Sequence, residues 1–207
     1  MSSSMKAATR TRSDVKRAAI IQAAKQAFQE YGVNATSMDK LAELAKVSKR
    51  TVYNHFNAKE ELVMHLIKEL WHKTMTSIDV RYEADKALHP QLSALLRAEV
   101  ELITGDEYLE LARVAFGYFF YNPDKLKDEI SQLTAQETVL HRWLVAAQRG
   151  GRLQFDDLDF VVKELSSLLK GHCFWPQLLK IEPPLSNSMK HKVAESTAAM
   201  CLSRYAV

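Results

Sequence analysis

The chain has 207 residues, of which 47% are hydrophobic and 26% charged, with a net charge of +3, so it can bury a substantial core in one large or two small domains. Its polar, basic N-terminal stretch holds no signal-peptide apolar block, and no later run approaches a membrane span; we therefore expect a cytoplasmic protein without membrane association. The two cysteines, Cys173 and Cys201, lack CxxC spacing, which excludes a disulfide scaffold and a zinc ribbon and suggests two small core residues.

Helical periodicity dominates the chain from its N-terminal part onward. Apolar residues recur at three- and four-residue spacing, strict alternation is scarce, and glycine and proline are few, so an all-α fold is predicted. The first helix is expected to start at Ser13 as its cap and to carry an apolar face that includes Ile20 and Phe28. Gly32 is expected to end this helix as a left-handed cap.

Two short helices joined by a tight turn follow. The second helix is capped by Thr36 or Ser37 and ends at the break over residues 46–48. Ser48 then caps a third helix that reaches Phe56, with Val52 and Phe56 facing inward. The remaining surface of this third helix is left to residues with polar or charged side chains.

A long fourth helix and a larger helical region complete the chain. Asn57 or Ala58 opens the fourth helix, Asn57 and Glu60 are spaced as a capping box, and Leu62 and Leu66 begin an apolar stripe that Leu70 and Thr74 extend. Further helices are predicted over residues 90–103, 107–121, 123–149, 157–179 and 188–205.

Positive charge is concentrated near the N-terminus. Residues 1–65 hold eleven Lys and Arg against six Asp and Glu, whereas the remainder holds seventeen against nineteen. Such a cationic segment suits nucleic acid or an anionic membrane surface, although a charge excess alone is more often a solvated face.

The third helix has the residues that reading a DNA groove requires. A major groove about 12 Å wide admits one helix, base edges need hydrogen-bonding side chains, and phosphates need cations and hydroxyls. A three-helix bundle with a charged, solvated helix fits the spacing equally well.

The run ATSMDKLAELAKVSKRTVYNHFNAKEEL closely resembles the helix-turn-helix signature of the tetracycline-repressor (TetR/AcrR) family. The resemblance covers residues 15–62, and the chain length and helical layout also suit the family. Lys46 stands where the family usually has glycine, and Arg50 where a small residue often occurs. Lys46 puts the geometry of the turn in question, and Arg50 adds a side chain able to read a base.

The resemblance implies a flexible basic tail over residues 1–13, a DNA-binding domain over 14–58 and an effector-binding and dimerisation domain over 59–207. It assigns DNA phosphates to five side chains: Thr36, Ser37, Tyr53, His55 and Lys59. Bases or nearby phosphates are left to five others: Ser48, Lys49, Arg50, Thr51 and Asn54. An anion at the start of the fourth helix also suits the backbone N–H groups there. A guanine contact for Arg50 and a solvated or phosphate-bound Arg50 stay open, as does a packing role for Tyr53.

The resemblance further implies a homodimer that binds an inverted-repeat operator in double-stranded DNA, its last two long helices pairing with those of a second copy. One predicted stripe comprises Val161, Val162, Leu165, Leu168, Leu169 and His172. A second stripe comprises Val193, Thr197, Ala198, Cys201, Leu202 and Tyr205. Burial of both stripes within the monomer is the alternative.

A small apolar effector is also implied. Seven aromatic residues are candidates for lining its pocket: Tyr108, Phe116, Phe119, Phe120, Trp143, Phe174 and Trp175. An aromatic stripe at helical spacing is more often plain core, and core is the favoured interpretation for most of them.

No metal, cofactor or catalytic site is predicted. Glu61, His65, Glu69 and His72 stand at near-helical spacing, but a solvated polar face accounts for them. The chain lacks GxSxG, GxxxxGK, HExxH and GxGxxG motifs, which disfavours an enzyme. The rival to a regulator is a structural or adaptor protein whose helix-turn-helix no longer binds DNA.

Overall fold

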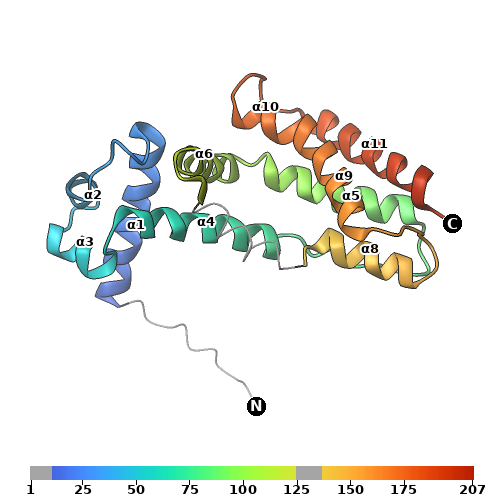
Figure 1. The fold of residues 1–207 in the computed structure, drawn as a ribbon, viewed down its shortest axis with the longest axis horizontal. Coiled ribbons are helices and arrows are strands. Elements are labelled where there is room, and N and C mark those ends of the chain that lie inside the picture. Colours follow the sequence, from blue (N-terminus) through green and yellow to red (C-terminus); the bar gives the residue numbers. More distant parts are fainter. Residues whose placement is uncertain (1–10, 125–136) are drawn as a thin grey trace, which may run out of the picture. The chain divides into compact units, whose positions relative to one another are not determined.

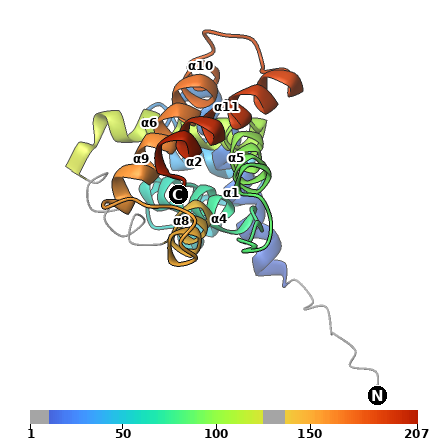
Figure 2. The same ribbon diagram turned by 90° about the vertical axis from the view of Figure 1, so that its right-hand side faces the viewer.

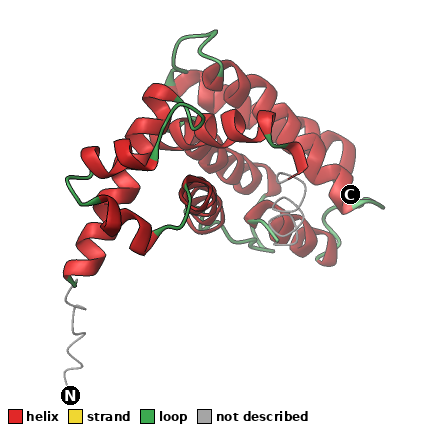
Figure 3. Ribbon diagram, turned by 60° about the vertical axis from the view of Figure 1, so that its left-hand side comes forward, coloured by secondary structure: helices red, strands yellow, loops and turns green. Residues whose placement is uncertain are grey.

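The computed structural model describes residues 11–124 and 137–207, and its described residues form helices joined by loops, without a strand (Figures 1 and 3). A single antiparallel bridge pairs Leu153 with Ala206. The helical structure of the described residues confirms the predicted all-α fold. The chain divides into two compact units: residues up to Lys68 together with Val114–Tyr121, and Glu69–Arg113 together with the remainder from Asn122.

Helix α1 (Arg12–Tyr31) has its N-cap two residues before the position that the sequence predicted. Thr11, not Ser13, is the N-cap: its Oγ1 accepts from the Asp14 N–H at 3.1 Å, and the Asp14 carboxylate accepts from the Thr11 N–H at 2.9 Å. The helix ends at Gly32, whose φ of 79° is positive as predicted but whose ψ of 160° is extended rather than left-handed helical.

Helices α2 (Met38–Leu44) and α3 (Lys49–His55) pack on α1 within the first unit. Their contact is apolar, since Ile20, Phe28, Leu41 and Val52 are all nearly or completely buried. Phe56 closes the same core directly after α3. Full burial of each such side chain contributes about 1.5–3 kcal/mol, which holds the two short helices in place.

Helix α4 (Lys59–Thr76) is preceded by a cap that differs from the predicted one. The Asn57 N–H and side-chain amide donate to the two carboxylate oxygens of Glu61, at 3.0 and 2.9 Å, rather than to Glu60. The division between the two units falls inside this helix, after Lys68.

The second unit is built around helix α11 (Asn187–Tyr205), which lies beside α5 (Leu88–Ile103) and α9 (Leu158–Leu169) in both views (Figures 1 and 2). Helix α8 (Val139–Arg149) packs on α9, and α6 (Asp106–Tyr121) follows α5. The largest wholly or nearly wholly buried side chains of this unit are Leu92, Leu95, Leu96, Leu140, Trp143, Leu144 and Leu169.

Two predicted long helices are interrupted. The helix predicted over 123–149 falls partly outside the described residues, but Thr138 caps a new helix at Val139, so it is not continuous. The helix predicted over 157–179 contains a wider π-turn, η1 (Lys170–Phe174), before α10 (Trp175–Leu178). Pro176 has no N–H for the carbonyl four residues earlier, and the wider turn lies directly before it.

Candidate nucleic-acid interface

Helix α3 presents one buried and one exposed face. Ser48 caps it as predicted, its Oγ accepting from the Thr51 N–H at 3.1 Å. Val52 points inward with no exposed surface, whereas the tyrosine that follows it is 44% exposed. The other exposed residues of the helix are Lys49, Arg50 and Asn54, and Thr51 and His55 are half-buried. The predicted groove-reading side chains therefore share the accessible side of α3.

The turn between α2 and α3 forms although Lys46 replaces the expected glycine. Lys46 adopts a φ of +54°, and its N–H donates to the Glu43 carbonyl while the Val47 N–H donates to the Ala42 carbonyl at 3.0 Å. A left-handed residue with a side chain costs about 1–2 kcal/mol. The turn keeps its hydrogen bonds at this cost, and the Lys46 side chain stays exposed.

Lys49 is held by an acidic residue that the sequence reasoning did not single out. Its ammonium lies 2.8 Å from the carboxylate of Asp39 on α2, and this hydrogen bond raises the pKa of Lys49 above its ordinary value. Both side chains are exposed. Ten residues separate them in sequence, so only the turn geometry brings the pair together.

Thr36 and Ser37 have different positions. The Ser37 hydroxyl is exposed and caps α2, accepting from the Lys40 N–H at 3.2 Å. Thr36 is buried, and its hydroxyl donates to the carbonyls of Gly32 at 2.8 Å and Ala27 at 3.3 Å. The predicted phosphate contact through the Thr36 hydroxyl does not fit this structure, because that hydroxyl is buried and already bonded.

A hollow of about 420 Å³ lies between the loop before α2, Tyr53 and the start of α4. Its lining is Asn34, Ala35, Thr36, Ser37, Met38, Tyr53, Asn57, Ala58, Lys59 and Glu60. The ammonium of the half-buried Lys59 donates to three backbone carbonyls, those of Val33 at 2.9 Å, Asn34 at 3.2 Å and Thr36 at 3.4 Å.

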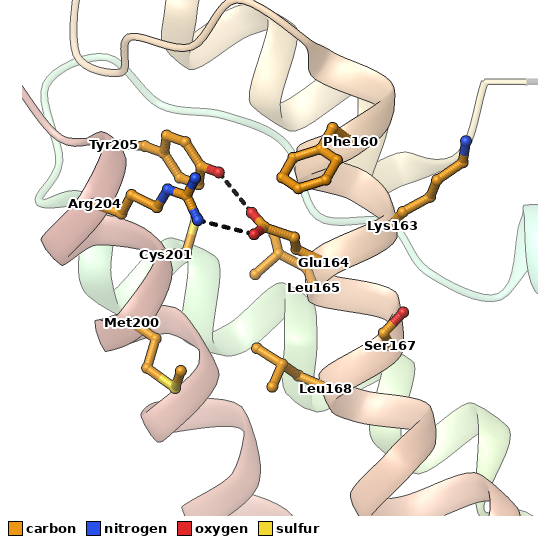
Figure 4. Close-up of a pocket in the computed structure, with 10 residues that line it drawn as sticks. All are labelled: Phe160, Lys163, Glu164, Leu165, Ser167, Leu168, Met200, Cys201, Arg204 and Tyr205. Atoms are coloured by element: carbon orange, nitrogen blue, oxygen red, sulfur yellow. Dashed lines mark hydrogen bonds and ion pairs between the residues drawn. The ribbon is translucent and has the colours of Figure 1, made fainter.

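A groove of about 560 Å³ runs between α9 and α11 in the second unit (Figure 4). Phe160 and Met200, 50% and 55% exposed, lie along it together with Leu168. At one end, Glu164 accepts from Arg204 at 2.9 Å and from the Tyr205 hydroxyl at 2.5 Å. The groove is thus apolar along its length and has an internally paired charge cluster at its end.

The two stripes predicted for dimerisation are largely internal. On α9 and its continuation, the buried members are Val161, Leu165 and Leu169. On α11 they are Val193, Thr197, Ala198 and Cys201. Because helix α11 packs against α5 and α9 of its own chain, half of the first stripe and four of the six residues of the second belong to the monomer core. The adjacent face that carries Phe160 and Met200 is the exposed apolar one.

The seven candidate pocket aromatics lie in separate surroundings. Tyr108 meets Phe174 edge to face at 6.0 Å, and Phe174 in turn meets Trp175. Buried Trp143 instead meets Tyr82, whereas Phe120 is 78% exposed. The remaining two candidates, Phe116 and Phe119, are half-buried and buried. A single aromatic-lined cavity built from all seven is therefore not what the described residues form.

Beside this aromatic cluster lies an acidic side chain without a predicted role. Burial raises the pKa of Glu99 on α5 to about 7, and the positive charge of Lys170 opposes the shift. Burial also raises the pKa of Tyr108, and the negative charge of Glu99 adds to it.

The described residues form neither a metal-binding cluster nor a helix suited to a membrane. Within residues 11–124 and 137–207, no group of three or more His, Cys, Asp or Glu side chains is placed to hold a metal ion. Over the same residues, no helix combines the length and the apolar character needed to cross a bilayer.

Sequence profiles of two known domains match most of the chain. Residues 20–66 match the bacterial regulatory proteins of the tetR family, and residues 90–207 match the C-terminal domain of an AefR-like transcriptional repressor. The first match contains α2, α3 and their turn. The second extends from α5 to the last described residue.

Individual proteins show the same similarity. The HTH-type transcriptional regulator TtgR of Pseudomonas putida is 38% identical over 82 residues, which are 40% of this chain and 39% of the relative. The chain thus spans about two fifths of the length of the curated relatives it matches. A TetR family transcriptional regulator from Pseudomonas syringae is 36% identical, with a TM-score of 0.81 over 94% of this chain and 98% of that one.

The fold extends to more distant proteins. A TetR transcriptional regulator from Agrobacterium tumefaciens has a TM-score of 0.71 at 21% identity, over 93% of this chain and 94% of that one. At this identity the likeness concerns the fold alone.

Proposed function

The chain belongs to the TetR family of transcriptional regulators, which are not enzymes, and we propose that it is a cytoplasmic repressor that binds an inverted-repeat operator as a homodimer and releases it when a small molecule binds. The observation that carries this proposal is helix α3. Its inward residue Val52 is fully buried, while Lys49, Arg50 and Asn54 are exposed on a helix that a capped, hydrogen-bonded turn fixes against α2. Such a helix can enter a major groove.

Phosphate contacts are proposed around this helix. The exposed Tyr53 and the Ser37 hydroxyl both line the hollow beside α3, and His55 stands in the last turn of that helix. Hydroxyl and imidazole groups can donate hydrogen bonds to phosphate oxygens, as can the backbone N–H groups at the start of a helix. The hydroxyls of Ser48 and Thr51 hydrogen-bond each other at 2.8 Å at the start of α3. A DNA contact from either hydroxyl would therefore be made in addition to this bond. Base reading is proposed for Arg50 and Asn54.

A homodimer is proposed through the groove between α9 and α11. An exposed phenylalanine and an exposed methionine on adjacent helices form an apolar surface beside the buried core of the unit. A second copy related by two-fold symmetry would cover the same surface on both chains. The four helices would then form a bundle, as the family resemblance implies.

The first prediction concerns the operator. Purified protein should select fragments of genomic DNA that carry an inverted repeat, because one α3 reads only a few base pairs and a two-fold dimer presents two of them. Sequencing of the bound fragments and light scattering at micromolar concentration provide the measurements. Selected sites without dyad symmetry would contradict the dimeric mode of binding, and absence of any salt-dependent DNA affinity would favour an adaptor protein instead.

The second prediction concerns the effector, for which we propose a small, largely apolar molecule bound among the helices after Met64, where Tyr108 and Phe174 meet. Its binding should weaken operator affinity by about 5- to 150-fold, a coupling of about 1–3 kcal/mol. Operator DNA must then weaken the molecule's affinity by the same factor. Hits from a thermal-shift screen should be titrated against the protein with and without operator; equal affinities would mean that the molecule does not regulate DNA binding.

A further inference from the structure

Lys59, the first residue of α4, is half-buried, and its ammonium group donates to three backbone carbonyls of the loop before α2. The three carbonyls around its Nζ belong to Val33, Asn34 and Thr36, at 2.9, 3.2 and 3.4 Å. An ammonium has three N–H donors, so these carbonyls match its whole donor capacity. We call this arrangement of one ammonium and three carbonyls the Lys59 clamp.

The clamp grips the loop that sets the position of α2. Thr36, directly before the α2 cap, contributes a carbonyl to the clamp, while its buried hydroxyl donates to the carbonyls of Gly32 and Ala27. The loop is therefore fixed to α1 through one side chain and to α4 through another. Because α2 packs on α3, the start of α4 is connected to the exposed helix by a short series of hydrogen bonds and packed side chains.

We propose that Lys59 is a positioning residue that fixes the orientation of the α2–α3 pair relative to α4, rather than a side chain that neutralises a DNA phosphate. This inference rests on the proposed function and replaces the phosphate contact that the sequence implied for Lys59. Movement of α4 on effector binding then reaches α3 through the clamp. A phosphate oxygen could bind this ammonium only by displacing a carbonyl, beside two carboxylates of the same first turn, Glu60 and Glu61.

The salt dependence of DNA binding separates positioning from phosphate contact. Lys59→Met keeps the aliphatic stem and removes the ammonium, and it should bind a random-sequence duplex about tenfold more weakly with an unchanged slope of log affinity against log salt. Each lost phosphate contact lowers that slope by about 0.9. Lys46→Met, which removes a charge from the exposed turn before α3, is the matched control and should lower it.

A slope that falls by about 0.9 in Lys59→Met would overturn the proposal, because Lys59 would then contact a phosphate. Unchanged affinity with an unchanged slope would also overturn it, since the clamp would then position nothing that DNA binding needs.

A measurement on the unaltered protein guards against a variant that fails to fold. In lysine-labelled ¹⁵N NMR, the Lys59 ammonium protons should exchange slowly with water and couple to carbonyl carbons, both before and after the duplex is added. Coupling to phosphorus on the DNA complex, or rapid exchange in the free protein, would overturn the proposal. If the unaltered protein binds no duplex, the proposed function fails, whereas the signal of the free protein still reports whether the clamp exists.

Discussion

Met200→Lys should leave the monomer folded and abolish the dimer. Met200 is 55% exposed, so the new ammonium is solvated in the monomer and the helix keeps its core. In a two-fold dimer across the groove, the charge would be buried twice, next to Lys163 and Arg204 of the same lining. Burying an unpaired charge costs several kcal/mol. The dissociation constant of the dimer should therefore rise by at least about a hundredfold, which corresponds to about 2.8 kcal/mol.

Sedimentation or light scattering at micromolar concentration measures this change, and circular dichroism confirms that the variant is folded. Operator affinity should fall with the dimer, because a monomer reaches only one half-site. Ala94→Lys is the control: it adds the same charge at an exposed position of α5, outside the groove. An unaltered dimer in Met200→Lys would show that the groove is not the interface.

Arg50→Ala should erase the preference for one base pair in each half-site. A guanidinium that grips a guanine with two hydrogen bonds contributes about 1–3 kcal/mol of discrimination. A dimer presents two copies of Arg50, so the loss on a symmetric operator is about 2–6 kcal/mol, from about thirtyfold to more than ten-thousandfold in affinity. Binding to random duplex should weaken much less.

Fluorescence anisotropy with the selected operator, and with operators altered at one symmetric pair of positions, measures this effect. The unaltered protein should reject three of the four bases at that pair, and Arg50→Ala should bind all four alike. Lys46→Ala removes a charge from the exposed turn before α3 and should change affinity without regard to sequence. If Arg50→Ala weakened binding to all of these operators alike, Arg50 would contact a phosphate rather than a base.

Local sequence patterns predicted the helices well and their ends less well. Thr11 and Asp14 have the spacing of a capping box, so the true start of α1 was readable, but Ser13 offered a competing cap. At α4 the predicted and observed capping partners, Glu60 and Glu61, differ by one residue. Which of two neighbouring residues caps a helix depends on which turn packs onto the core, and the spacing of residues in the sequence does not show this.

The exposed face of α3 was predictable because a helical period separates Val52 from its neighbours. The role of Lys59 was not, because it depends on a loop 23 or more residues earlier in the chain that meets α4. The burial of Thr36 was not predictable either, because its hydroxyl bonds to the carbonyls of Gly32 and Ala27 form only when that loop packs on the end of α1. The partial burial of the predicted dimer stripes has a related reason. Period alone shows that α9 and α11 have apolar faces, but not that α11 packs on α5 and α9 within the same chain.

The first unit is discontinuous in sequence, because Val114–Tyr121 belongs to it together with the residues up to Lys68. Four of these later residues, Val114, Ala115, Tyr118 and Phe119, are buried. A fragment cut after Lys68 would therefore lack a piece of its own interior. A gene fusion that carries only the N-terminal sequence would consequently not transfer the whole first unit. Recombination that exchanges this unit between proteins must also keep the second half of α6, or replace it with a segment that packs equally well.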